Sequence, residues 1–235
     1  MCGRFVQHAD PEIYASRYDA EVLQALPART GQGYNVAPTQ RVLAVRTADG
    51  RERELAPLRW GLVPHWSKGP DERYSMINAR AETVHSKPAY RDAFRRRRCL
   101  IPAEGFYEWR AARGGKQPYL MRRDDGEPFV MAGLWETWSP DDGAQPLESC
   151  TIIVTDANDL IAPVHDRMPV ILGDADLDAW LDPANQDSDA LQALLRPAPT
   201  GGWRLHPVSK VVNSPRNDSP DLIEPVPEPP PPAAG

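Results

Sequence analysis

The second residue of the chain, Cys2, combines two nucleophiles once the initiator Met1 has been removed. We expect that removal because an initiator methionine is cleaved before a small side chain such as cysteine. The thiol and the freed α-amine have pKa values of about 8.5 and about 7.7–8.0 in model compounds. With an aldehyde, the amine forms an imine and the thiolate then closes on the same carbon, which gives a five-membered thiazolidine. The closure is intramolecular and benefits from an effective molarity of roughly 10⁵ M or more.

Three side chains, those of His165, Glu104 and Glu108, are of types that transfer protons. His165 could exchange a proton near neutral pH, and Arg167 close by suits a phosphate. Glu104 and Glu108 would lie on one face of an expected strand. Burial of either carboxyl would raise its pKa toward neutrality, as a general acid requires. The residues alone leave open which glutamate acts, and whether His165 is structural.

Asn78, Arg80 and Glu82 alternate along the chain. An extended backbone would put all three side chains on one face. An asparagine beside an arginine could hold an anion or orient a nucleophile. The alternative is a turn that leads into a capped helix.

The other two cysteines, Cys99 and Cys150, lie in apolar stretches, and no Cys-x-x-Cys spacing occurs. We therefore expect buried small hydrophobic side chains rather than a zinc site or a disulfide framework. The sequence predicts no metal and no cofactor.

The chain of 235 residues, 41% hydrophobic and 26% charged, has the composition of a soluble globular protein with room for a core. Neither a bilayer-spanning apolar run nor a signal peptide is visible, so we expect a cytoplasmic protein without membrane partners. The net charge of −6 argues against a surface coated in positive charge for non-specific nucleic-acid binding. The basic residues of segment 87–98 could form a local groove or a solvated helix face.

Periodicity and turn residues predict the elements that carry these side chains. Helices are expected at residues 10–26, in part of 80–97, and at 174–181 and 188–195, the first of them capped by Asp10 and Pro11. Strands are expected at residues 42–45, 58–62, 99–102, 105–109, 119–122, 129–134 and 150–155.

Strands in the middle of the chain with helices inserted, and no βαβ rhythm, predict an α+β fold. We expect a single domain over residues 2–223, with a mixed, largely antiparallel, barrel-like β-sheet core and peripheral helices. Residues 224–235 form a proline-rich tail that is expected to be extended and disordered.

Seven short segments, in order, resemble the SOS response-associated peptidase (SRAP) family, whose members are abasic-site processing proteins that crosslink themselves to DNA. The segments are residues 1–5, 34–38, 60–64, 77–83, 105–109, 165–169 and 206–209. The similarity extends from residue 2 to about residue 224.

The resemblance implies a role for individual residues. Cys2 would be the crosslinking residue, Asn78 would orient the N-terminus, and Glu108, rather than Glu104, would be the catalytic glutamate together with a catalytic His165. The resemblance implies that Arg4, Arg80 and Arg167 contact DNA phosphates and that Trp66 stacks on a neighbouring base. Some relatives carry two tryptophans where this chain has His65 and Trp66.

The implied function is that of an abasic-site sensor in single-stranded DNA, associated with the nucleoid when bound, acting as a monomer and shielding the lesion from strand cleavage. Lyase or autopeptidase activity is an associated expectation, and a replication partner cannot be read from the sequence. N-terminal-nucleophile amidohydrolases, which also use a freed cysteine, are the alternative enzyme class. A non-catalytic DNA-binding module is a third reading, but it leaves Cys2 and Glu108 without a role.

Overall fold

A closed five-stranded β-barrel forms the centre of the computed structural model, which describes residues 2–23, 30, 33–48, 52–71, 75–112 and 115–228. Neighbouring strands are antiparallel except at one seam, where β5 and β11 run parallel. This arrangement confirms the predicted α+β fold with a mixed, largely antiparallel barrel. The barrel strands, in chain order, are β4 (Arg41–Ala48), β5 (Glu52–Trp60), β7 (Arg98–Ala103), β10 (Phe129–Trp138) and β11 (Leu147–Asp156).

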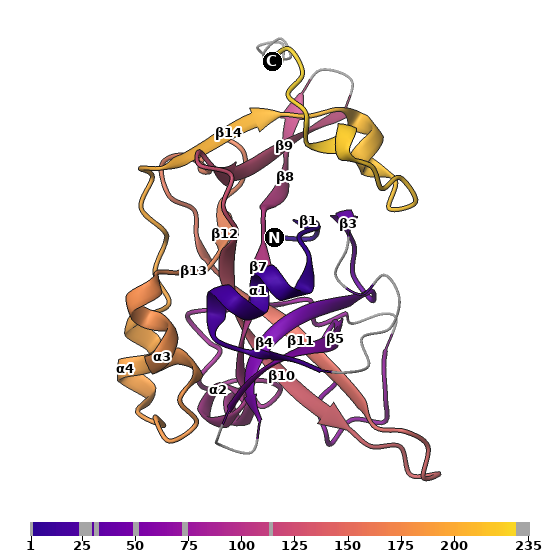
Figure 1. Ribbon diagram of the computed structural model, residues 1–235, viewed down its shortest axis with the longest axis vertical. Coiled ribbons are helices and arrows are strands. Elements are labelled where there is room, and N and C mark those ends of the chain that lie inside the picture. The colour runs from indigo at the N-terminus through magenta and orange to yellow at the C-terminus, as the bar shows by residue number, and fades with distance from the viewer. Residues whose placement is uncertain are drawn as a thin grey trace.

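A second sheet holds the N-terminal strand in its interior. Its order is β14-β9-β8-β1-β3, so β1 is paired on both sides, by β8 and by β3. Figure 1 shows β1 near the middle of the molecule, beside β8, which rises toward β9 and β14. The strands of this sheet are β1 (Phe5–Gln7), β3 (Gly33–Val36), β8 (Gly105–Ala112), β9 (Gly115–Arg123) and β14 (Trp203–Pro207).

Short strands and helices surround the barrel, with α3 and α4 stacked together at one side (Figure 1). No helix in the described part of the chain is long and apolar enough to cross a membrane. The short strands are β2 (Glu21–Val22), β6 (Asn78–Arg80), β12 (Arg167–Pro169) and β13 (Ile171–Leu172); the helices are α1 (Pro11–Tyr18), α2 (Arg91–Arg96), α3 (Leu177–Leu181) and α4 (Ser188–Ala193), with 3-10 turns at Asp174–Asp176, Lys210–Asn213 and Pro220–Ile223.

The first helix begins as predicted and ends early. Asp10 accepts a hydrogen bond from the backbone N–H of Glu12, and Pro11 occupies the first helical position. At Asp19 the backbone turns left-handed, with φ of 51°, and this stops the helix after Tyr18. The expected helix over 10–26 is therefore too long, because β2 follows directly; residues 24–29 lie outside the described part.

The three cysteines are all buried in one apolar cluster with barrel side chains such as Trp60 and Ile152. The prediction for Cys99 and Cys150 is thereby confirmed. Cys2 shares this environment because β1 lies inside its sheet, and its side chain is inaccessible to solvent.

The basic segment around α2 divides into structural and exposed residues. Arg98 is buried, and its guanidinium donates to the backbone carbonyls of Phe94 and Trp180. Arg95 and Arg96 are exposed at the end of the helix. The segment does not act as one continuous basic surface.

The proline-rich end differs in part from the expectation. The backbone N–H of Val226 donates to the carbonyl of Pro207 at 2.9 Å, and Glu228 contacts Arg110 and Tyr119. Residues 224–228 therefore lie against the folded domain, because the N–H of Val226 and the carboxylate of Glu228 are hydrogen-bonded to it. Residues 229–235 lie outside the described part.

Candidate active site

The pairing of β1 with β8 brings Cys2 near a buried glutamate, Glu108. The N–H of Tyr107 donates to the carbonyl of Arg4 at 3.0 Å, which continues the antiparallel ladder toward the chain start. The next residue along β8 is Glu108. The thiol of Cys2 contacts the Arg4 carbonyl at 4.0 Å. Burial, and then the nearby Glu108 carboxylate, raise the pKa of the Cys2 thiol well above its ordinary value.

Glu108 has the protonation behaviour that acid–base chemistry needs. Its side chain is almost fully buried, and this burial raises its pKa to about 7. Half of the carboxyl groups are then protonated near neutral pH, so Glu108 could donate a proton and take one back.

Glu104, the other candidate from the sequence, is engaged in the fold. One carboxylate oxygen accepts from the hydroxyl of Tyr14 at 2.5 Å, and the other accepts from the backbone N–H of His8 at 2.8 Å. These bonds tie the start of α1 to the barrel. Glu104 therefore has a structural role, while Glu108 faces a cavity.

His165 approaches Glu108 from the loop between β11 and β12. Its Nδ1 accepts from the backbone N–H of Arg167 at 3.0 Å, which leaves the proton of the neutral ring on Nε2. Nε2 lies 3.9 Å from Oε2 of Glu108. Burial lowers the pKa of His165, which favours the neutral ring. When the ring is protonated, Nδ1 can donate to the Asp166 carboxylate, 2.9 Å away.

A cavity of about 620 Å³ lies in front of Glu108 and His165. Three of its lining residues, Trp109, Lys116 and Asn213, were not predicted as site residues from the sequence. Asn213 follows closely after the segment 206–209, which was the one signal for it, and accepts a hydrogen bond from the indole N–H of Trp109 at 2.8 Å. The lining residues are Arg4, Glu108, Trp109, Lys116, His165 and Asn213.

Asn78 lies on β6, which pairs in parallel with β11. Its Nδ2 donates to the carbonyl of Ile77 at 3.0 Å. Its Oδ1 is buried and has no hydrogen-bond partner within the described ranges. A buried acceptor without a partner is costly, so this oxygen is available to a donor such as an amine. Asn78 is not among the lining residues of the Glu108 cavity.

Arg80 and Arg167 flank strand β11. Arg80 is exposed and pairs with Val154, whereas Arg167 pairs with Asp156. The guanidinium of Arg167 is bonded to Glu82 and lies 3.3 Å from Asp156. Glu82 sits in the turn after β6. Of the two alternatives left open by the sequence, an extended backbone therefore describes Asn78 and Arg80, and a turn describes Glu82.

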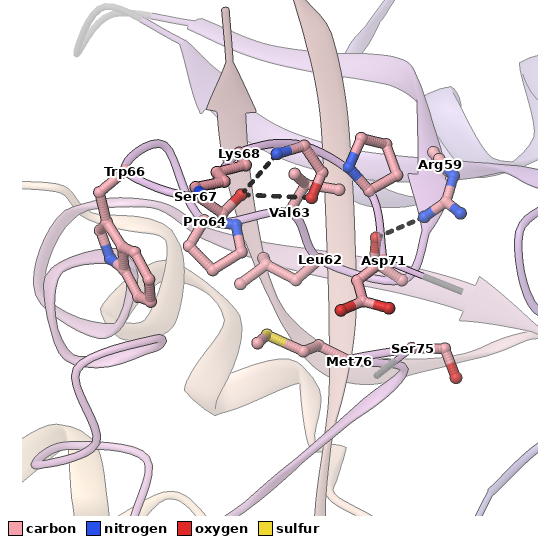
Figure 2. A pocket seen from close by; sticks show the side chains of 13 residues that line it. Arg59, Leu62, Val63, Pro64, Trp66, Ser67, Lys68, Asp71, Ser75 and Met76 are labelled. Carbon is pink, nitrogen blue, oxygen red and sulfur yellow. Dashed lines mark hydrogen bonds between the residues drawn. The ribbon is translucent and has the colours of Figure 1, made fainter. Parts of the chain in front are cut away.

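Trp66 lines a second cavity, of about 660 Å³, that is separate in its lining from the Glu108 cavity. In Figure 2 the indole of Trp66 stands at one end, with Arg59 and Asp71 at the other. The indole is 58% exposed. Strand β10 holds the loop that carries Trp66, because the indole N–H of Trp138 on that strand donates to the carbonyl of Ser67 at 2.8 Å.

No group of three or more His, Cys, Asp and Glu side chains within the described residues could hold a metal ion.

Comparison with known proteins identifies the family. Residues 1–215 match the family described as SOS response associated peptidase (SRAP). Over 226 residues, covering 95% of this chain and 99% of the relative, the sequence is 43% identical to the abasic site processing protein YoqW of Bacillus subtilis (strain 168). It is 30% identical to the abasic site processing protein YedK of Escherichia coli (strain K12), covering 96% and 100% of the two chains. The X-ray crystal structure of a protein from Bacteroides thetaiotaomicron, 26% identical, superposes with a TM-score of 0.85 over 96% of this chain and 100% of that one. The chain belongs to the SRAP family.

Proposed function

We propose that the protein, once Met1 is removed, forms a covalent thiazolidine between Cys2 and the ring-opened aldehyde of an abasic site in single-stranded DNA. The observation that carries this proposal is the placement of Cys2 beside Glu108, a buried carboxyl with a pKa of about 7 at the wall of a cavity. The relatives named abasic site processing proteins support the substrate class.

The reaction balances with Glu108 as the proton-transfer group. Glu108 donates its proton to the ring oxygen of the deoxyribose and takes the proton of the C1′ hydroxyl, which opens the sugar to the aldehyde. The Cys2 amine attacks the aldehyde carbon, and an amine proton passes to the carbonyl oxygen. Glu108 then protonates the resulting hydroxyl, which leaves as water and gives a protonated imine. The ionised Glu108 takes the proton of the Cys2 thiol while sulfur attacks the imine carbon, which gives the thiazolidine with its N–H. An aldehyde and an aminothiol thus become a thiazolidine and one water.

A base that takes the thiol proton during attack is needed because burial raises the pKa of Cys2. His165, neutral with its proton on Nε2, donates a hydrogen bond to the sugar oxygen or to the departing water. The free Oδ1 of Asn78 is suited to accept from the Cys2 amine and orient its lone pair.

Ring closure explains how the lesion is protected. An imine acidifies the neighbouring C–H and promotes β-elimination, which cuts the strand. The thiazolidine has no imine, so elimination stops. The crosslink shields the abasic site rather than repairing it.

DNA phosphates would be held by Arg80 and Arg167. Arg80 is exposed, while Arg167 would exchange its carboxylate partners for a phosphate. Arg4 lines the cavity, but its guanidinium is already bonded to Asn35 and to backbone carbonyls. Trp66, exposed on its own cavity, would stack on a nearby base. Each phosphate contact makes binding more salt-dependent.

The test is a denaturing gel of the protein mixed with a single-stranded oligonucleotide that bears one abasic site. The N-terminus is first checked by mass spectrometry. We expect a slow band without borohydride, which disappears in Cys2→Ala. That variant keeps an α-amine, so it should form an imine and shift the products toward strand cleavage. Cys150→Ala, a buried cysteine elsewhere, is the control and should crosslink normally.

Two results would contradict the proposal. Stable crosslinks at wild-type yield from Cys2→Ala would exclude the thiazolidine. The absence of any band from protein confirmed to begin at Cys2 would favour an N-terminal-nucleophile amidohydrolase, for which release of ammonia from glutamine is the assay.

A further inference from the structure

Asn35 joins the two ends of the chain through one buried amide. It lies on β3 and is only 2% exposed. Its Nδ2 is within hydrogen-bond distance of three carbonyls, those of Val212 at 3.1 Å, Ser214 at 3.0 Å and Asn217 at 2.8 Å. Its Oδ1 accepts from the guanidinium of Arg4 at 2.7 Å. The amide therefore has partners on both its nitrogen and its oxygen.

Arg4 is held by the same C-terminal segment. Its guanidinium donates to the carbonyl of Val212 at 2.9 Å and to that of Asn213 at 3.4 Å. The backbone carbonyl of Arg4 accepts from the N–H of Tyr107 at 3.0 Å and faces the thiol of Cys2 at 4.0 Å. Arg4 thus connects the C-terminal residues Val212 and Asn213 to Cys2, the proposed nucleophile.

We propose that Asn35 is a positioning residue for Cys2, acting through Arg4, and that the main work of Arg4 is to fix the N-terminus rather than to bind phosphate. This inference rests on the crosslinking function proposed above. The place of Cys2 beside Glu108 depends on how firmly Arg4, two residues away, is held. A reacting atom displaced by about 1 Å lowers the rate by roughly 10²-fold.

The geometry favours this role for Arg4. Two of its guanidinium nitrogens already meet one amide oxygen and two carbonyls, and burial lowers its pKa. A phosphate would have to compete with these bonds. Arg80, by contrast, is exposed.

Asn35→Ala separates positioning from binding when rate and affinity are measured independently. The crosslinking rate is measured in single turnover with the abasic oligonucleotide at saturation. Affinity is measured by fluorescence anisotropy with a tetrahydrofuran abasic analogue, which has no aldehyde and cannot crosslink. We expect the saturated rate to fall by at least about tenfold, with the Kd changed by less than about threefold.

Asn185→Ala is the matched control. Asn185 also bonds a backbone carbonyl, that of Ala179, but it lies in the loop between α3 and α4. We expect its saturated rate and its Kd to equal those of the wild type. A thermal melt of each variant shows that the protein compared is folded.

Arg4→Lys provides the second variant and keeps the test decisive if Asn35→Ala folds poorly. Lysine keeps the charge but cannot reproduce the forked contacts of the guanidinium. We expect the same loss of saturated rate with a nearly unchanged Kd.

Two results would overturn the inference. The first is a wild-type saturated rate in either folded variant. The second is a weakened Kd in Arg4→Lys with an unchanged saturated rate, which would make Arg4 a phosphate contact. Both leave the crosslinking function standing, because the wild type still crosslinks; a wild type that fails to crosslink removes the proposed function and this inference together.

Discussion

The imidazole Nε2 of His165 lies 3.9 Å from the carboxylate Oε2 of Glu108, and the two residues come from different sheets. Glu108 belongs to β8, in the sheet of the N-terminal strand, whereas His165 lies in the loop two residues before β12, which pairs with the barrel strand β11. The site therefore forms where the two sheets meet, and the exposed carboxylate of Asp166 lies beside both groups.

Asp166→Asn should lower the pKa of both His165 and Glu108. The Asp166 carboxylate stabilises the protonated imidazole and disfavours ionisation of Glu108, so it contributes an upward shift to each group. An NMR titration of the His165 ring should show the lower pKa, and the acid–base inflection of the crosslinking rate should move to lower pH. Asp159→Asn, an exposed residue of the same loop, should change neither; an unchanged His165 pKa in Asp166→Asn would contradict the assignment.

Glu108→Gln should slow crosslinking and should stabilise the folded protein at alkaline pH. The pKa of Glu108 is about 7 in the folded protein, against an ordinary value of 4.5. The folded state therefore retains the proton between these values, and stability falls as pH rises from about 4.5 to about 7. Above that range, ionisation of the buried Glu108 lowers the free energy of unfolding by about 3 kcal/mol.

Urea unfolding measures this effect. The free energy of unfolding of Glu108→Gln should exceed that of the wild type by up to about 3 kcal/mol at high pH and equal it near pH 4. Crosslinking by the variant should slow by roughly 10²–10⁴-fold. Equal stabilities of the two proteins at high pH would show that the Glu108 pKa is not raised.

Arg80→Ala should reduce the salt dependence of DNA binding. Arg80 is exposed beside β11, and loss of one phosphate contact lowers the slope of log K against log salt by about 0.7 for a single strand. Anisotropy titrations with the tetrahydrofuran oligonucleotide at several salt concentrations give the slope. Arg204→Ala, exposed on β14, is the control for general charge; the same slope in Arg80→Ala and in the wild type would remove Arg80 from the DNA contacts.

Trp66→Ala should weaken DNA binding without destabilising the fold. The indole is 58% exposed, so its removal leaves no cavity in the core, while loss of one base stack costs about 1–3 kcal/mol of binding. The comparison is Ile13→Ala, whose side chain is 51% exposed on α1 and should bind DNA normally. Wild-type affinity in Trp66→Ala would mean that the second cavity does not contact the strand.

Local patterns predicted those parts of the fold that local interactions determine. Asp10 and Pro11 predicted the start of α1, and apolar runs predicted the barrel strands. The end of α1 was missed because it depends on the left-handed backbone of Asp19 and on the pairing of β2 with β5.

The candidate site was less accessible to sequence reasoning because long-range partners decide it. Glu104 and Glu108 have equivalent places in the strand pattern, and only the family resemblance favoured Glu108. The structure distinguishes them, because Glu104 is bonded to Tyr14 and His8 whereas Glu108 lines a cavity. Asn35 lies in segment 34–38, one of the seven that resemble the family, but the segment does not indicate the role proposed for it. Its partners are the distant Arg4 and backbone carbonyls beyond residue 211, which no side-chain pattern reveals.

The anchoring of Arg4 by the carbonyls of Val212 and Asn213 has a consequence for synthesis on the ribosome. Cys2 is among the first residues to emerge, yet the segment that fixes it is translated roughly 10 to 40 s later at ordinary elongation rates of about 5–20 residues per second. During that interval the nascent chain carries its nucleophile without the assembled pocket. The reactivity proposed for Cys2 therefore depends on translation past Asn213, and translation products that end before this residue would be inert.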